Sequence, residues 1–300
     1  MPDDTDFRGT RTHSTMLKRL LNLPESVTDQ RLREVCDDFN AKVYAKVRVA
    51  DVLPIECSGI DNEHYRYALQ AHFDFVVTDS TDQSLFAVEF DGSGHSAPDD
   101  QKRDGMKNML CDRFELPLLR INRKYLSRAF SSWDLLRWFC TVFFVKRGWD
   151  EDVKAGRIPI EDSVFDPMFV SVRTKSGTRS LELERHARAE LGRMFRSGEI
   201  PDYVPNWITA EGNNRTLRAI SWIETSDQLG TIAETAMQQQ NLGSWVQFAI
   251  RGIVLNELQN NVSAVVRGAE PALPLLSIKE RVKDFEGRFK TIMSLRKGVG

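Results

Sequence analysis

Two short apolar segments that each carry one acidic residue decide the fold of this chain: HFDFVV at residues 72–77 and LFAVEF at residues 85–90. A polar turn at residues 79–83 separates them, which predicts a hairpin of two strands. The second segment is nearly continuous in apolar residues, so we expect it to be a central strand. Because the strands of a hairpin lie side by side, Asp74 in the first strand and Glu89 in the second should be close together.

The segments around this hairpin complete a small α/β domain. We expect a helix with Thr28 as its N-cap and a strand at residues 43–49 before the hairpin, with a loop at residues 54–66. A helix at residues 98–114 and a strand at residues 118–121 follow it. A helix between two neighbouring strands favours a parallel crossover. The predicted fold is therefore an αβββαβ core with a mixed central sheet.

This core occupies residues 28–125. Residues 1–27 read as an N-terminal tail with a short helix that ends at Pro24, and residues 126–300 as a mainly α-helical domain of unknown role with one strand near residues 217–223. All six tryptophans lie in this last region, where they form a core or, alternatively, platforms on which unpaired bases stack. Its amphipathic helices between residues 227 and 260 suit a homo-oligomer interface or a partner protein.

Composition limits the class of protein. The content of 41% apolar and 28% charged residues is ordinary for a globular chain, and the net charge of -2 excludes a generally basic nucleic-acid coat. A nuclease is not excluded, because its phosphate contacts can be confined to one cleft. The four cysteines form no CxxC pair that would indicate a zinc ribbon. Without a long apolar run or an apolar leader, we expect a cytoplasmic protein that does not enter a membrane.

Three carboxylates gather at one end of the predicted sheet. Asp91 lies two residues after Glu89, and alternate residues of a strand share one face, so both can point toward Asp74. Three such groups repel each other unless a cation lies between them, and Mg²⁺ prefers oxygen ligands of this kind. Alternatively, Asp74 is an edge residue or caps a turn, and the cluster is incidental.

The helix at residues 98–114 adds cations to this end of the sheet. Its predicted apolar face is formed by Met106, Met109, Leu110 and Phe114. Lys102 and Arg103 fall within that face and Lys107 at its border, where a plain amphipathic helix would place apolar residues. We expect one or more of them to reach the carboxylates. Alternatively, they extend along the edge of the core with their charges in water.

These motifs together resemble a known family. The segments are FDFVV at residues 73–77, AVEFDGSGH at 87–95, QKRDGMK at 101–107 and LPLLRI at 116–121, with YAKVRVADVL at 44–53 upstream. They are similar to the PD-(D/E)XK, or restriction-endonuclease-like, nucleases, in a bacterial branch close to the very-short-patch repair endonucleases. That branch has DF in a strand, then (I/V)E-x-DG-x-x-H, a helix with RD-x-x-K, and PLLRI.

The resemblance implies a metal site. Asp74 and Glu89 would hold Mg²⁺ or Mn²⁺, and Glu34 on the first helix would complete the outer metal shell. His95 matches the histidine of DG-x-x-H and would shuttle a proton, unless it is a structural residue of a glycine-rich loop.

One position departs from the family pattern. A lysine normally stands two residues after the glutamate, where this chain has Asp91. Lys107 or Lys102 from the following helix would then supply the lysine, and Asp91 becomes a second-metal ligand or a residue of the outer shell. If neither lysine reaches the site, the fold binds nucleic acid without cutting it.

The implied activity is hydrolysis of phosphodiester bonds in nucleic acid, with DNA favoured, in restriction, repair or anti-phage defence. Arg103, Arg120 and Arg123 would contact backbone phosphates, although the last two also suit an ordinary solvated strand end. The alternative is a catalytically inactive nuclease fold that binds nucleic acid or acts as a scaffold.

Overall fold

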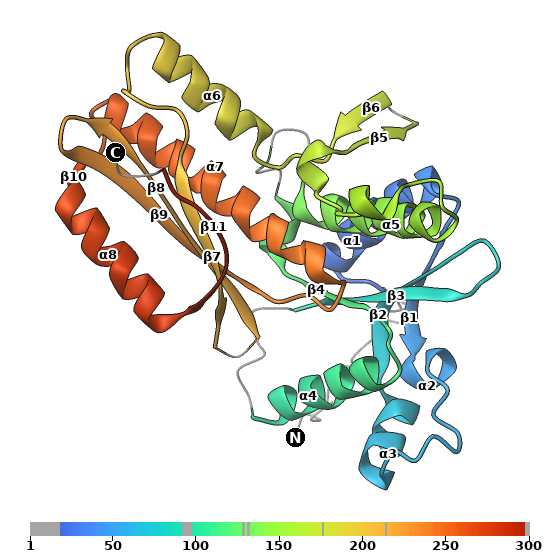
Figure 1. Cartoon of the computed structure of the whole chain (residues 1–300). Coiled ribbons are helices and arrows are strands. Elements are labelled where there is room, and N and C mark those ends of the chain that lie inside the picture. Colours follow the sequence, from blue (N-terminus) through green and yellow to red (C-terminus); the bar gives the residue numbers. More distant parts are fainter. Residues whose placement is uncertain are drawn as a thin grey trace, which may run out of the picture.

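The computed structural model describes residues 19–91, 98–127, 130, 133–175, 177–213 and 215–297. Two α/β units lie side by side in this part of the chain (Figure 1). The helices are α1 (Leu23–Asp38), α2 (Val49–Val52), α3 (Asn62–Gln70), α4 (Pro98–Arg113), α5 (Leu135–Lys154), α6 (Arg185–Arg196), α7 (Gln247–Val266) and α8 (Leu275–Arg288). The strands are β1 (Lys42–Arg48), β2 (His72–Thr78), β3 (Ser84–Phe90), β4 (Leu118–Ile121), β5 (Ser171–Thr174), β6 (Gly177–Ser180), β7 (Asn206–Gly212), β8 (Thr216–Ser226), β9 (Leu229–Gln238), β10 (Leu273–Pro274) and β11 (Lys290–Leu295). Short 3-10 turns include η1 (Arg123–Leu126).

The N-terminal sheet has the predicted topology. Its strand order is β1-β2-β3-β4, with antiparallel pairs β1/β2 and β2/β3 and a parallel pair β3/β4. The expectation of a mixed α/β sheet with β3 in a central position is therefore confirmed. Helices α1 and α5 lie on one face, and α3 and α4 lie on the other (Figure 1).

The start of the first helix differs from the prediction. Helix α1 begins at Leu23, and the side chain of Asn22 accepts a hydrogen bond from the Glu25 backbone N–H while the Glu25 carboxylate accepts one from the Asn22 N–H. Pro24 was expected to end a helix, but it lies in the first turn, where the missing N–H of proline costs nothing. Thr28, expected as the N-cap, is buried within the helix and donates its hydroxyl to the Pro24 carbonyl.

The connection between β1 and β2 is more ordered than predicted. Residues 54–66 were expected to be a loop, but helix α3 begins inside this range. Asp61 is its N-cap and accepts a hydrogen bond from the His64 backbone N–H at 2.9 Å. The sequence reading missed this helix because it is short and largely polar, with Ala68 as its one buried residue.

The C-terminal unit contains the expected helices and, in addition, a sheet. Strands β7, β8, β9, β10 and β11 form an antiparallel sheet in the order β10-β9-β8-β7-β11, with α7 on one face and α8 on the other. The description of this region as mainly helical is therefore incomplete. In particular, most of residues 227–238, which we expected to be helical, form strand β9.

Helix α7 lies inside the molecule. Buried residues occur all around it and include the polar Arg251, Asn256 and Gln259. In the described structure it packs against β7, β8, β9 and α6, so it does not offer the exposed partner surface that its sequence suggested.

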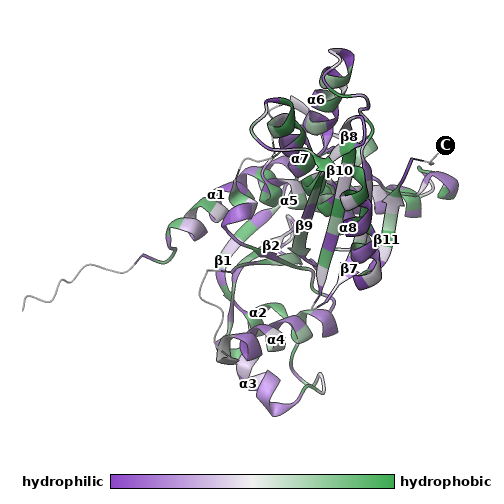
Figure 2. Ribbon diagram, turned by 90° about the vertical axis from the view of Figure 1, so that its left-hand side faces the viewer, coloured by the Kyte–Doolittle hydropathy of each residue, from purple (hydrophilic) through white to green (hydrophobic). Residues whose placement is uncertain are grey.

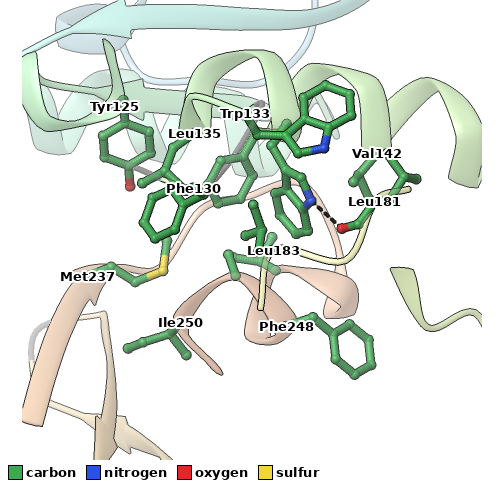
Figure 3. Packing of buried hydrophobic residues seen from close by; sticks show 14 of the residues in the cluster. Tyr125, Phe130, Trp133, Leu135, Val142, Leu181, Leu183, Met237, Phe248 and Ile250 are labelled. Atoms are coloured by element: carbon green, nitrogen blue, oxygen red, sulfur yellow. Dashed lines mark hydrogen bonds between the residues drawn. The ribbon is translucent and has the colours of Figure 1, made fainter. Parts of the chain in front are cut away.

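One hydrophobic core joins the two units. It extends from α1 and the N-terminal sheet through α5 to α7 and the C-terminal sheet. Figure 3 shows part of it, where Trp133, Leu135, Leu183 and Ile250 pack together. Four of the six tryptophans are buried, and Trp138 donates its indole N–H to the Leu181 carbonyl at 2.7 Å. These four tryptophans therefore form part of a core, which was one of the two alternatives predicted from the sequence.

The outer helices α3 and α4 carry many hydrophilic residues (purple in Figure 2). Among the described residues, none of the helices has the length and apolar content needed to span a membrane.

Candidate active site

Strands β2 and β3 bring Asp74 and Glu89 together. Phe75 pairs with Val88 in the antiparallel hairpin. Asp74, which precedes Phe75, and Glu89, which follows Val88, therefore lie at the same end of the hairpin. The Asp74 backbone N–H donates to Glu89 Oε1 at 3.3 Å, and the Phe90 N–H donates to Asp74 Oδ2 at 2.9 Å. Each carboxylate is thus held by the backbone of the other strand, so two acidic side chains lie in fixed positions at one sheet end.

Helix α4 supplies a cation to this pair. Lys107 is only 7% exposed, and its Nζ lies 2.7 Å from Glu89 Oε2. The ammonium also donates to the His72 carbonyl at 2.8 Å and lies 5.5 Å from the centre of the Phe73 ring. An ammonium carries three N–H donors. Two of those of Lys107 have acceptors among the described residues, so the third can serve a ligand.

The buried face of α4 differs slightly from the prediction. Lys107, Leu110 and Cys111 are buried, whereas Met109, expected on the apolar face, is 36% exposed. Compared with the prediction, the buried face of the helix is therefore rotated toward Lys107. The predicted apolar face had Lys107 only at its border.

Glu89 has a perturbed acidity. Burial raises the pKa of its carboxyl most, the Lys107 ammonium lowers it, and the nearby Asp74 carboxylate raises it, so that the pKa is about 7. Glu89 consequently changes charge near neutral pH. A strongly shifted carboxyl next to a specific cation is a common feature of functional sites.

A second lysine completes the cluster. The register of β1 against β2 places Lys46 opposite Asp74, and its Nζ lies 2.6 Å from Asp74 Oδ1 and 2.9 Å from Glu25 Oε1. Burial lowers the pKa of Lys46, but the hydrogen bonds to Asp74 and Glu25 outweigh it, so the pKa is raised. The Lys46 backbone has φ of 55°, a conformation that costs free energy for a residue other than glycine and that often marks functional sites.

Sequence reasoning missed both Lys46 and Glu25. Lys46 lies in the predicted strand at residues 43–49, and its pairing with β2 could have been inferred from the alternation of that strand. Glu25 could not, because the helix was expected to begin only at Thr28.

Asp91 belongs to a neighbouring ion cluster. Strand β3 ends at Phe90, and Asp91 Oδ1 lies 3.0 Å from Arg120 Nη1, which is also 3.1 Å from Asp104 Oδ1. The buried Arg120 additionally donates through Nε to Asn108 Oδ1 at 3.1 Å. Burial lowers the pKa of Arg120, but Asp91 and Asp104 outweigh it and raise the pKa. Asp91 is thus engaged with Arg120 next to the Asp74–Glu89 pair, and Arg120 has its ion-pair partners inside the protein.

Other predicted site residues lie away from the pair. Glu34 forms an ion pair with Arg137 of α5, whereas Glu25 at the start of the same helix is the residue of α1 that contacts Lys46 of the cluster. Lys102 lies 2.5 Å from Glu63 of α3, rather than at Glu89. Of the two lysines that the sequence offers to the acidic pair, the structure thus brings Lys107 to Glu89.

Arg103 and Arg123 are exposed and form no ion pair with a described residue, so both are accessible to phosphate. His95 lies outside the described residues.

The acidic pair fits a hard divalent ion with few protein ligands. No group of three or more His, Cys, Asp or Glu side chains suited to a metal occurs among the residues that the structure describes. Asp74 and Glu89 supply two carboxylates, and Mg²⁺ is commonly held by one or two carboxylates together with substrate phosphate. The two lysine ammonium groups show that the site already stabilises positive charge. The donor set therefore fits Mg²⁺ or Mn²⁺, provided that Lys46 gives up its contact with Asp74.

Comparison with known proteins assigns no activity to this site. Neither the curated proteins nor the solved structures gave a match. Residues 17–130, which include Asp74, Glu89, Lys107 and Lys46, are similar to a protein family described only as a protein of unknown function, DUF2726.

Proposed function

We propose that this protein is a Mg²⁺- or Mn²⁺-dependent phosphodiester hydrolase that cuts nucleic acid, with DNA as the favoured substrate. The observation that supports it is the buried contact of 2.7 Å between Lys107 and Glu89, next to Asp74. Two carboxylates and one lysine at the end of a hairpin are the residues that the resemblance to PD-(D/E)XK nucleases requires. Lys107 from α4 takes the place of the lysine that the sequence lacks at position 91.

Each residue has a role in the proposed reaction. Asp74 and Glu89 hold the metal ion, which when bound polarises the scissile phosphate and lowers the pKa of the attacking water. Lys107 keeps Glu89 in place and offers its remaining N–H to the negative charge that develops on the phosphate oxygens. Arg103 and Arg123 contact the phosphate backbone and orient the strand. Restriction, repair and anti-phage defence are the processes that such an activity would serve.

One observation favours the alternative of a non-cutting nucleic-acid-binding fold. In the structure, each carboxylate already has an ammonium partner, Lys46 on Asp74 and Lys107 on Glu89. If neither lysine yields to a divalent ion, the cluster is an ordinary buried ion network, and the exposed arginines only bind phosphate.

A cleavage assay separates the two functions. The purified protein is incubated with plasmid and linear DNA in Mg²⁺, Mn²⁺ or EDTA, beside an Asp74→Asn, Glu89→Gln double variant. The matched control is Asp82→Asn, since Asp82 also pairs with a lysine of β1 but is exposed at the β2–β3 turn. We expect metal-dependent cleavage by the wild type and the control, and none by the double variant.

The opposite result is equally informative. If the wild type cuts neither DNA nor RNA with either metal, while the wild type and the double variant bind nucleic acid equally, the protein is the non-cutting binding fold. Circular dichroism of each variant shows that a lost activity is not a lost fold.

A further inference from the structure

A cavity of about 410 Å³ lies between the two units. Its walls come from β4 and η1 of the N-terminal unit and from β9 and α7 of the C-terminal unit. Tyr125, Phe130, Leu135 and Met237, which Figure 3 shows near one another, contribute to its apolar lining. Polar and apolar residues line the cavity in similar numbers, and its volume lies within the roughly 300–1,000 Å³ that is typical of small-ligand sites.

The cavity adjoins the candidate active site. Asp91 and Asn122, which line it, directly follow the parallel strands β3 and β4. In α/β sheets, ligands bind outside the carboxyl ends of the strands. Asp91 is two residues beyond Glu89, so a nucleic-acid strand held at Asp74 and Glu89 can place a neighbouring nucleotide in this cavity.

The polar groups of the cavity are complementary to one kind of ligand. Glu257 of α7 accepts a hydrogen bond from the Thr235 hydroxyl through Oε1 at 3.1 Å and forms no ion pair with a described residue. Burial raises the pKa of Glu257, although Thr235 and Lys124 oppose the shift. Lys124 lines the same cavity. A half-buried carboxylate beside a lysine offers acceptors next to a donor.

A guanine base carries on one edge the groups that are complementary to a carboxylate and to an ammonium. Its amino group and ring N–H are adjacent donors for a carboxylate, and its O6 accepts a hydrogen bond from an ammonium. The flat ring would lie against the apolar lining that Phe130 and Met237 provide. Thymine and uracil have only one N–H donor on this edge, so they match the carboxylate less well.

We propose that this cavity binds one unpaired guanine, read by Glu257 and Lys124. That the guanine belongs to a bound nucleic-acid strand rests on the proposed function. The same polar groups would also bind a free guanine nucleotide. It assigns a role to α7 and β9, because the C-terminal unit then selects the base while the N-terminal unit holds the backbone.

Binding is measured by calorimetry with the full chain in EDTA, so that no cleavage occurs. One series of ligands is the 5′-monophosphates of guanosine, inosine and uridine. The other is a short oligothymidylate that carries one guanine or, as its match, one hypoxanthine, which lacks the amino group. Binding of guanosine monophosphate alone would identify a free nucleotide as the ligand. Binding of the guanine-containing oligonucleotide alone would identify a base of a nucleic-acid strand.

Two variants test the cavity itself. Glu257→Gln should weaken binding of guanine about tenfold, because each well-placed base contact contributes on the order of 1–3 kcal/mol to discrimination. Ala236→Trp, which adds a ring to an exposed residue of the cavity wall, should abolish it. The control is Glu270→Gln, an exposed residue beyond α7 that does not line the cavity.

Preference for guanine over hypoxanthine and uracil, lost in both cavity variants and kept in the control, is the expected result. Equal binding of all bases, no binding in either series, or unchanged binding in Glu257→Gln and Ala236→Trp would overturn the proposal. A protein that binds guanine but cuts no DNA would contradict the proposed function alone. Cleavage without any guanine preference would contradict only this inference.

Discussion

Among the buried ion clusters of the described residues, one in each unit of the molecule can be compared, and the two are built differently. The N-terminal cluster pairs Asp74 with Lys46 and Glu89 with Lys107. In the C-terminal unit, Arg251 pairs with Glu184, and its Nε lies 3.0 Å from Glu184 Oε1. Both clusters contain side chains that are less than 12% exposed, so burial alone does not distinguish them.

The two clusters differ in the kind of cation that they contain and in how far that cation is exposed to solvent. The guanidinium of Arg251 lies near the rings of Trp207 and Phe248, with distances of 5.6 and 5.0 Å to the ring centres, so packing fixes it. By contrast, the Lys46 side chain is 38% exposed, and an ammonium is a point charge that another cation can replace. We infer that the C-terminal cluster holds the fold together, whereas the N-terminal cluster is able to exchange a cation.

The largest expected effect is on catalysis at Lys107. Lys107→Met should reduce cleavage at least about a hundredfold, as the loss of one preorganised donor to developing charge does in other enzymes. Lys107→Arg should retain part of the activity because it keeps the charge. The control Lys102→Met, on the exposed side of the same helix, should change the rate little. A reversed order, with Lys102→Met inactive and Lys107→Met active, would remove Lys107 from the proposed mechanism. Rates are measured on plasmid DNA with saturating metal.

The C-terminal cluster should respond in stability instead. Glu184→Leu removes the nearer carboxylate from the buried Arg251 and leaves Asp166 at 3.5 Å; loss of one partner of a buried ion pair typically costs about 3–5 kcal/mol. We expect a loss of this order in the free energy of unfolding, measured with urea. At a low temperature, where the Glu184→Leu variant is still folded, it should cleave nucleic acid at the normal rate.

The matched control for this effect is Glu190→Leu. Glu190 pairs with Arg193 on the surface of α6, and exposed pairs contribute roughly 0–1 kcal/mol. A stability loss in Glu184→Leu no greater than in the control would mean that the C-terminal cluster is not a structural element.

The metal affinity should depend on pH through Glu89. The pKa of this carboxyl is raised by burial to about 7 in the folded protein, from an ordinary value of 4.5. A metal ligand must be deprotonated, so Mg²⁺ binding should strengthen as the pH rises from 6 to 8. Below the pKa, the expected change approaches tenfold for each pH unit.

Stability without metal should change in the opposite direction. Because the folded-state pKa is the higher one, protonated Glu89 contributes stability that is fully present below pH 4.5 and is lost as the pH rises through about 7. Calorimetry and urea unfolding at several pH values test both trends. A metal affinity that does not vary between pH 6 and 8 would show that Glu89 is not a ligand.

Local sequence patterns predicted the core of the N-terminal cluster. Asp74 and Glu89 stand out because acidic residues are rare in apolar strands, and the short polar turn between the strands fixes them as neighbours. Lys107 was recognisable because a cation at the edge of an apolar helix face needs a partner. These inferences use contacts within a hairpin or across one crossover, which the sequence period specifies well.

Contacts between distant elements could not be predicted in this way. The family resemblance implied that Glu34 completes a metal shell, but in the structure its partner is Arg137 of α5, more than 100 residues later. The sheet of the C-terminal unit was missed because strand β9 contains small and polar residues that carry little periodicity. Its burial depends on α7, whose own pattern was read as a surface helix.

The smallest expected effect concerns Lys46. It shows whether this ammonium competes with the metal ion for Asp74 or holds Asp74 in position for the metal ion. Lys46 occupies Asp74 Oδ1, so a divalent ion must displace its ammonium. A partly exposed ion pair contributes up to about 1 kcal/mol, which corresponds to roughly fivefold in a binding constant. Lys46→Met should therefore bind Mn²⁺ several-fold more tightly in the absence of DNA, as measured by calorimetry. Lys42→Met, which removes the exposed partner of Asp82 on the same strand, should leave the affinity unchanged. If Lys46→Met instead weakens Mn²⁺ binding, Lys46 holds Asp74 in position for the metal, and the N-terminal cluster shares the fixed character of the C-terminal one.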